Sequence, residues 1–167
     1  MARPASKPVV SVCFVCLGNI CRSPTAEGVF AKLVADAGLR ERVAIDSAGT
    51  GAWHKGELAD KRARQEGERR GIELTSVARQ FIPTDFNRHD LIVAMDQDNV
   101  AELQRIARTD GQRAKIVLLR SFDPRSPRDA EVPDPYYGGL DGFARVFDLC
   151  QVACEGLLAH VREQYGL

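Results

Sequence analysis

The sequence of 167 residues lacks an excess of charge of either sign, since 23 Lys and Arg residues are balanced by 23 Asp and Glu residues. Proteins that bind nucleic acid or an anionic membrane surface usually carry a basic excess, so we expect neither partner. The chain also lacks an apolar run that would suit a membrane span or a secretory signal. We therefore expect a cytoplasmic protein.

Two further absences concern cofactors and disulfides. No Gly-x-x-x-x-Gly-Lys nucleotide loop occurs, and the glycine-rich stretch 49–56 lacks the third glycine of a dinucleotide fingerprint. Five cysteines are an odd number in a chain without an export signal, which argues against a disulfide framework. Cys13 and Cys16 are three apart on a predicted strand and point to opposite faces, so they cannot hold one metal ion. We expect no cofactor and no metal, and we assign Cys13 to the core.

What the chain does contain is a strand, a short loop and a helix start in immediate succession. Residues 9–15 are an apolar, β-branched run typical of a buried strand. Ser23 and Pro24 predict a helix start with Ser23 as the N-cap, and the helix is predicted to end before Gly38. The loop between strand and helix runs from Cys16 to Arg22. Its backbone N–H groups and the helix dipole favour a bound oxyanion.

The residue types in this loop predict a nucleophilic thiolate beneath a bound phosphoryl group. A helix N-terminus and a nearby cation favour an ionised Cys16, and the Arg22 fork suits two phosphoryl oxygens. Gly18 and Asn19 tolerate positive φ, which a loop with inward amides requires. Asn19 is expected to brace the loop, and Ser23 to donate a hydrogen bond to the Cys16 sulfur. The predicted phosphate-binding residues are Leu17, Gly18, Asn19, Ile20, Cys21 and Ser23.

The remaining cysteines have different interpretations. Cys21 is either a resolving thiol that traps an oxidised Cys16 as a disulfide or a small buried residue, and the sequence leaves both open. Cys150 and Cys154 lie on the apolar stripe of a helix predicted over 143–165. We therefore assign these two to the core.

The rest of the chain alternates between predicted strands and helices. Strands are predicted at 42–48, 90–95 and 115–119, and helices at 26–37, 58–70, 99–108 and 143–165. This rhythm favours parallel strands with right-handed crossovers and helices on both faces. We expect a flexible extension at 1–7 and one three-layer α/β domain at 8–167. Ligands of such sheets bind beyond the carboxyl ends of the strands, which is where the loop 16–22 is expected.

Two irregular stretches are candidates for the walls of a cleft. The first, 49–56, contains the only tryptophan, Trp53, which we assign to a cleft wall, and His54, which we expect to form a hydrogen bond within its loop. The basic cluster in the helix that follows is assigned no role.

The second irregular stretch, 120–139, is long enough to indicate function. Asp134, between two prolines, is predicted to protonate a leaving group, and Tyr136 and Tyr137 to line the entrance. Asp123 and Asp129 are expected to pair with arginines at the surface.

Three stretches together resemble the low-molecular-weight protein tyrosine phosphatases: VCLGNICRSP at 15–24, DSAGT at 46–50 and DPYY at 134–137. The resemblance implies a flavodoxin-like fold of the phosphotyrosine phosphatase I type and metal-free hydrolysis of phosphotyrosine monoesters through a cysteinyl-phosphate. It implies Cys16 as nucleophile, Arg22 as the phosphate-binding arginine, Asp134 as general acid and Ser47 as a hydroxyl supporting Asn19. It further implies phosphotyrosine-containing proteins as substrates and a cognate bacterial tyrosine kinase as a partner. We expect a monomer.

Three alternatives stay open. A phosphoarginine phosphatase would share the loop, but such relatives tend to carry Thr at the position of Ile20 and Phe at that of Tyr136. An arsenate reductase of the same fold would need two more cysteines after the second helix, and none lies between Cys21 and Cys150. A non-catalytic phosphate-binding module is disfavoured because thiol, arginine and acid are all present.

Overall fold

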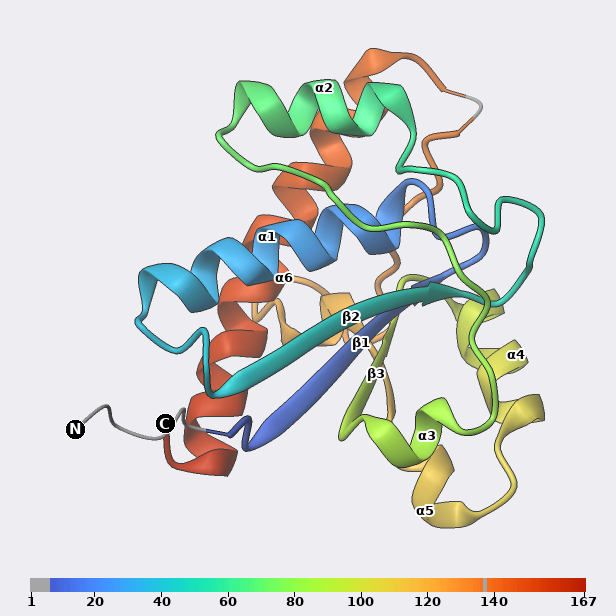
Figure 1. Ribbon diagram of the computed structural model, residues 1–167, viewed down its shortest axis with the longest axis vertical. Helices are drawn as coiled ribbons and strands as arrows, with labels where there is room; N and C mark the ends of the chain where they lie inside the picture. The colour runs from blue at the N-terminus through green and yellow to red at the C-terminus, as the bar shows by residue number, and fades with distance from the viewer. Residues whose placement is uncertain (1–6, 137) are drawn as a thin grey trace.

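A four-stranded parallel sheet in the order β2-β1-β3-β4 forms the centre of the computed structural model, which describes residues 7–136 and 138–167 (Figure 1). Its strands are β1 (Val10–Cys16), β2 (Val43–Gly49), β3 (Leu91–Ala94) and β4 (Ile116–Leu118). Each neighbouring pair is parallel, as the alternation of strands and helices predicted. Residues 1–6 of the predicted extension lie outside the described residues.

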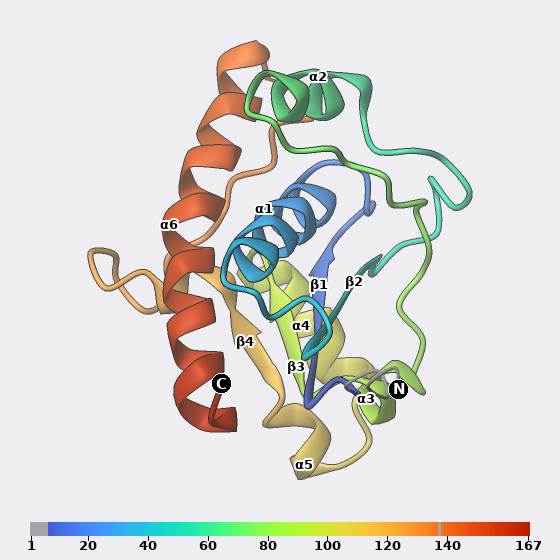
Figure 2. The same cartoon turned by 60° about the vertical axis from the view of Figure 1, so that its left-hand side comes forward.

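Helices cover both faces of this sheet (Figure 2). On one face, α1 (Arg22–Asp36) packs against β1, β2 and the long α6 (Leu140–Tyr165), and α2 (Lys61–Arg69) packs on α6. On the other face, α4 (Gln97–Ile106) packs against β3 and β4, beside the short α3 (Asp85–Arg88) and α5 (Asp110–Arg113). A 3-10 helix, η1 (Leu119–Phe122), follows β4. The three-layer prediction is confirmed.

Alternate residues of β1 enter two separate cores. Val12, Phe14 and Cys16 belong to the core beneath α1 and α6. Cys13 and Val15 belong to the core beneath α3 and α4. The prediction that Cys13 and Cys16 point to opposite faces is therefore confirmed.

The long helix α6 buries one apolar stripe. Its members recur at three- and four-residue steps, and each fully buried large apolar side chain contributes about 1.5–3 kcal/mol to folding. The stripe comprises Phe143, Val146, Phe147, Cys150, Ala153, Cys154, Leu157 and Val161. Cys150 and Cys154 are core residues, as predicted.

The start of α1 differs from the prediction. The helix begins at Arg22 with Cys21 in the cap position, and no side chain caps it. The assignment of Ser23 as N-cap is therefore wrong. The reason is that the loop 16–22, called the phosphate loop below, winds directly into the first helical turn. The Ser23 hydroxyl is then free to contact Cys16. Pro24 is then the third helical residue, where the missing N–H costs nothing because the first four have no partner within the helix.

The prediction for Asp123 is also wrong. Its side chain is buried and organises a turn, since it accepts hydrogen bonds from the Arg125 backbone N–H and the Ser126 hydroxyl, both at 2.9 Å. A buried carboxylate next to free backbone N–H groups is better satisfied by them than by an exposed guanidinium.

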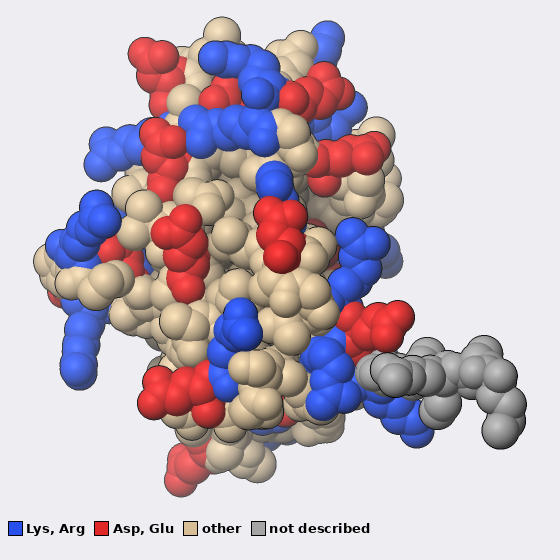
Figure 3. Space-filling view, turned by 90° about the vertical axis from the view of Figure 1, so that its left-hand side faces the viewer, with Lys and Arg blue, Asp and Glu red and all other residues tan. Residues whose placement is uncertain are grey.

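The surface agrees with the balanced composition. On the face shown in Figure 3, basic and acidic side chains are interspersed rather than gathered into a field of one sign. Among the described residues, no helix combines the length and the apolar character that crossing a bilayer requires.

Candidate active site

A cavity of about 330 Å³ opens where β1 meets α1, at the carboxyl end of the sheet. Cys16, the last residue of β1, lines it and is only 3% exposed. The cavity is lined by Cys16, Leu17, Gly18, Ile20, Cys21, Arg22, Trp53, His54, Asp134 and Tyr136. Residues predicted from three distant stretches are thus brought to one hollow.

The Cys16 sulfur receives two polar contacts. The Asn19 backbone N–H donates to it at 3.3 Å, and the Ser23 hydroxyl lies 3.1 Å away. Donors in these positions stabilise negative charge on sulfur. The contact expected between Ser23 and the thiol is therefore present.

Asn19 holds the loop in its curled shape. Its φ of 57° is the only positive value among the described residues other than glycine. Its side-chain N–H₂ donates to the hydroxyls of Ser23 at 2.8 Å and Ser47 at 3.0 Å, and its Oδ1 accepts the Arg79 backbone N–H at 3.0 Å. All three bonds form in a side chain that is 1% exposed. The loop is thereby fastened to β2 and to the segment before α3.

Ser47, which supports Asn19, is itself bonded to the half-buried carboxyl of Glu27, a residue to which the sequence analysis gave no role. Ser47 donates its hydroxyl proton to Glu27 of α1 at 2.7 Å. Burial raises the pKa of Glu27, and the Ser47 bond opposes this rise. A carboxyl in the second turn of the helix that follows the loop was the available signal, but nothing local indicated its partner.

Arg22 is almost fully buried beside two carboxylates. Its Nη1 donates to Asp96 Oδ2 at 2.5 Å and to the Val132 carbonyl at 3.1 Å, and its Nη2 lies 3.7 Å from Asp134 Oδ2. Burial opposes the charge on Arg22, but the Cys16 sulfur and Asp96 outweigh it, so its pKa is raised. These contacts fix the guanidinium at the mouth of the loop.

Asp96 is the functional residue that sequence reasoning missed most clearly. One carboxylate oxygen caps α4 by accepting the Asn99 N–H at 2.8 Å, and the other pairs with Arg22. The sequence did contain a signal, because Asp96 follows the predicted strand 90–95 directly. Residues after the carboxyl ends of parallel strands lie at the ligand-binding edge of the sheet.

The loop carrying Asp134 is tied to α2. Asp134 Oδ1 accepts the Tyr136 N–H at 3.0 Å. Arg62 of α2 donates to the Tyr136 carbonyl at 3.0 Å, and its guanidinium lies 4.6 Å from the centre of the Phe143 ring. Asp60 orients Arg62 through a 3.0 Å ion pair. At least one member of the basic cluster in α2 therefore has a structural task, contrary to the prediction.

Aromatic side chains form the cavity rim. Trp53 lines the cavity and is 74% exposed, and the centre of the His54 ring lies 6.0 Å from that of Tyr136. His54 pairs with Glu57 at 2.6 Å, a partner that the sequence did not indicate, and its place in the cavity wall was not foreseen either. Tyr137 lies outside the described residues.

Cys21 faces the cavity from the same loop as Cys16 and is 5% exposed. Burial raises the pKa of its thiol, with Asp60 adding to the rise. All five cysteines are free thiols in the structure. Both interpretations of Cys21 stay predictions.

Comparison with known proteins agrees with this geometry. Residues 11–166 match the family model of the low molecular weight phosphotyrosine protein phosphatases. A low molecular weight protein-tyrosine-phosphatase of Streptomyces coelicolor is 53% identical over 154 residues, which cover 92% of this chain and 94% of the relative.

Two solved structures extend the comparison. A protein tyrosine phosphatase of Entamoeba histolytica superposes with a TM-score of 0.88 at 42% identity, covering 93% of this chain and 98% of that one. The Drosophila arginine phosphatase gives a TM-score of 0.84 at 34% identity, covering 90% and 97%.

Proposed function

This chain belongs to the low molecular weight phosphotyrosine protein phosphatase family, and we propose that it hydrolyses phosphotyrosine monoesters in proteins through a cysteinyl-phosphate. One observation carries the proposal. A thiol and a buried guanidinium from one loop and a carboxylate from a distant segment line one cavity with an aromatic rim. That is the set required to attack phosphorus, to bind its oxygens and to protonate the leaving group.

Cys16 is the proposed nucleophile. Its sulfur lies at the floor of the cavity, where the Asn19 N–H and the Ser23 hydroxyl support the thiolate. Attack in line on phosphorus forms the S–P bond and breaks the bond to the tyrosyl oxygen. Charge that develops on the equatorial oxygens is met by loop N–H groups and by Arg22.

Arg22 can keep its present partners during this step. Its Nη1 bonds Asp96 and the Val132 carbonyl, while its Nη2 lies 3.7 Å from Asp134, beyond hydrogen-bond distance. The Nη2 edge therefore has donors left for a phosphoryl group. Asp96 keeps the guanidinium aimed while those donors engage substrate.

Asp134 is the proposed general acid. Its side chain is 42% exposed and faces the cavity mouth, where a leaving oxygen would depart. After delivering its proton it accepts one from water, which attacks phosphorus and releases phosphate and the Cys16 thiolate. The same carboxyl thus serves both steps.

Replacing Cys16 by Ser tests the covalent step. We expect Cys16→Ser to abolish turnover of an aryl phosphate and the burst of phenol that precedes steady state. Cys154→Ala, which removes a thiol from the core of the same protein, is the matched control and should keep both. Turnover by Cys16→Ser at the wild-type rate would refute the mechanism.

Replacing Asp134 tests the acid. Asp134→Asn should slow an ester of a poor leaving group far more than one of an acidic phenol, because the latter needs little protonation. Equal losses for both esters would remove Asp134 from this role.

The second candidate follows from the likeness to the Drosophila arginine phosphatase. This candidate is hydrolysis of phosphoarginine. The two candidates are distinguished by comparing kcat/KM for a phosphotyrosine peptide and for a phosphoarginine peptide whose other residues are the same. We expect the phosphotyrosine peptide to be preferred, since the Trp53 and Tyr136 rings offer faces for an aromatic leaving group.

The partners and the location remain part of the proposal. A cognate bacterial tyrosine kinase that modifies the same tyrosines is the proposed partner, and the enzyme is proposed to act as a monomer. Five free cysteines support a reducing compartment such as the cytoplasm.

A further inference from the structure

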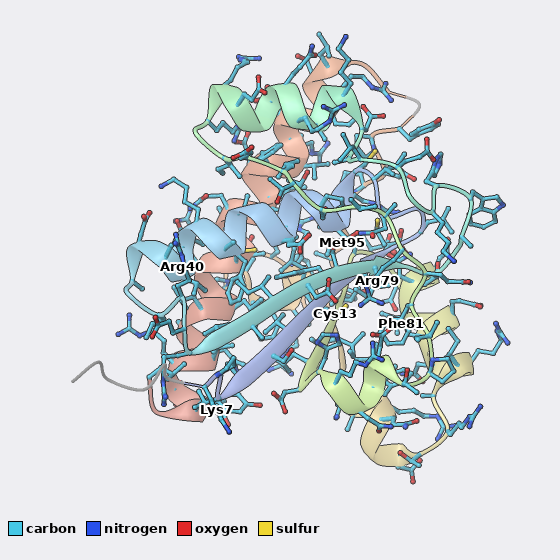
Figure 4. The ribbon with its side chains drawn as sticks, in the orientation of Figure 1. Lys7, Cys13, Arg40, Arg79, Phe81 and Met95 are labelled. Carbon is cyan, nitrogen blue, oxygen red and sulfur yellow. The ribbon has the colours of Figure 1, made fainter. Side chains whose placement is uncertain are left out.

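A second group of chemically active side chains lies on the opposite face of the sheet from Cys16. One ligand atom from each of Cys13, Asp46 and His89 lies within 4.8 Å of the other two. Cys13 and Asp46 are direct partners in the register of β1 and β2, and His89 follows α3 just before β3. Figure 4 shows Cys13 on β1 with Arg79 beside it. The sheet itself thus gathers these groups.

His89 has an unused donor atom directed into this cluster. The residue is 7% exposed, and its Nδ1 forms a 2.7 Å hydrogen bond with the Ser11 hydroxyl. Its Nε2 is buried and has no hydrogen-bond partner in the described part of the chain. A buried polar atom without a partner is costly, so its presence calls for a ligand.

The distances around Nε2 suit a metal ion. Asp46 Oδ2 lies 3.8 Å away and Asp85 Oδ1 lies 3.7 Å away, both too far for hydrogen bonds. Ligand bonds of about 2.0–2.3 Å in tetrahedral geometry place neighbouring ligand atoms about 3.3–3.8 Å apart. The Asp46 oxygen therefore stands at ligand-to-ligand distance from the imidazole nitrogen. Asp85 Oδ1 accepts an Arg79 N–H at 3.2 Å and belongs to the ion pair beside the site rather than to its ligands.

We propose that this cluster is a Zn²⁺ site. The ligands are Cys13 Sγ, His89 Nε2 and an Asp46 carboxylate oxygen, and the fourth position is left to solvent on the exposed side of Asp46. Sulfur, imidazole and carboxylate are the ligand types of Zn²⁺, and the Ser11 hydroxyl bonded to Nδ1 is an outer contact that orients the ring of a metal-bound histidine.

The charges of the cluster balance with a divalent ion. Zn²⁺ replaces the proton of Cys13, which leaves to solvent, and three negative groups result. Arg79 already pairs with Asp46 at 2.7 Å and with Asp85 at 3.0 Å, so it offsets one of the three. A charge of two plus neutralises the remainder.

The site is reachable and is connected to the phosphate loop. The Asp46 side chain is 44% exposed, which gives the ion a path from solvent. Asp46 accepts the Ser47 N–H at 2.8 Å, and the Arg79 N–H donates to Asn19. A bound ion would therefore help to hold Ser47 and Arg79, which both support the phosphate loop. The proposed metal site does not depend on the proposed phosphatase activity.

Cobalt and zinc binding to the full chain test the site. The Cys16→Ser variant, stripped of metal with a chelator, is the background because it removes the thiol of the cavity. Co²⁺ should bind one equivalent and give a thiolate-to-cobalt charge-transfer band, and Zn²⁺ should displace it. Adding Cys13→Ala should abolish the band and weaken Zn²⁺ binding at least tenfold, whereas adding Cys154→Ala, the matched thiol control, should change neither.

Two results would overturn the site. One is no binding of Co²⁺ or Zn²⁺ by the background variant, and the other is binding that Cys13→Ala leaves intact. If Cys13→Ala does not fold, His89→Gln in the same background decides the question. Zn²⁺ should raise the melting temperature of the background but not that of His89→Gln, and equal rises in both would refute the proposal.

Discussion

Asn19 offers the sharpest test of how the phosphate loop is held. Replacing it by Ala removes three buried side-chain hydrogen bonds, to Ser23, Ser47 and the Arg79 N–H. The change also leaves a residue with Cβ at a φ of 57°, a conformation that alanine adopts poorly. Two separable costs therefore fall on one position.

The magnitude follows from these contacts. Three hydrogen bonds at about 1 kcal/mol each give a loss of about 3 kcal/mol in the free energy of unfolding. The left-handed conformation adds about 1 kcal/mol for Ala and nothing for Gly, so Asn19→Gly should be about 1 kcal/mol less destabilised than Asn19→Ala. Because the loop aligns Cys16, even a shift of about 1 Å should lower kcat/KM by about 100-fold in both variants.

Urea unfolding and aryl phosphate kinetics measure the two effects. Asn87→Ala is the matched control, since Asn87 is an exposed residue of α3 and its loss should cost no more than about 0.5 kcal/mol. If Asn19→Ala matches this control in stability and retains wild-type kcat/KM, the loop does not depend on Asn19 and the reasoning fails.

Three further predictions follow from the same structure. Arg22→Lys should lower kcat/KM for an aryl phosphate by about 100- to 1000-fold, because lysine cannot bond Asp96 and present a fork to phosphate together; a loss below tenfold contradicts this. Burial raises the pKa of Glu27 in the folded protein, so its contribution to stability is present at low pH and is lost as pH rises through the raised value. Urea titrations should therefore show that Glu27→Gln gains stability relative to wild type as the pH rises from about 4 to about 7. A difference in the free energy of unfolding that stays constant over this range would contradict the prediction. Burial raises the pKa of Cys150 to about 12 and that of Cys154 well above its ordinary value, so peptide mapping should find neither alkylated by iodoacetamide until the protein unfolds.

The parts of this protein that could be predicted from its sequence are local or periodic. The apolar runs give every strand end to within one residue, and the stripe of α6 assigns Cys150 and Cys154 to the core. The thiol and guanidinium of the phosphate loop lie within one short stretch, so their types and spacing suffice to predict a common site.

The parts that could not be predicted depend on distant contacts. Asp96 reaches Arg22 across 74 positions, and Arg79 reaches Asn19 across 60. Ser23 has the residue type of an N-cap, but its hydroxyl is taken by the thiol, a competition that helix-start rules do not include. The cluster of Cys13, Asp46 and His89 was not predicted for the same reason, because the sequence analysis compared Cys13 only with its sequence neighbour Cys16.

The bond between Arg62 and the Tyr136 carbonyl bears on how such enzymes can be re-engineered. A loop exchange that transplants only the segment around Asp134 from another phosphatase would lose its anchor, because the anchor sits in a helix encoded more than 70 positions earlier. A chimera designed to alter leaving-group preference should therefore carry α2 and the proline-flanked loop as one module.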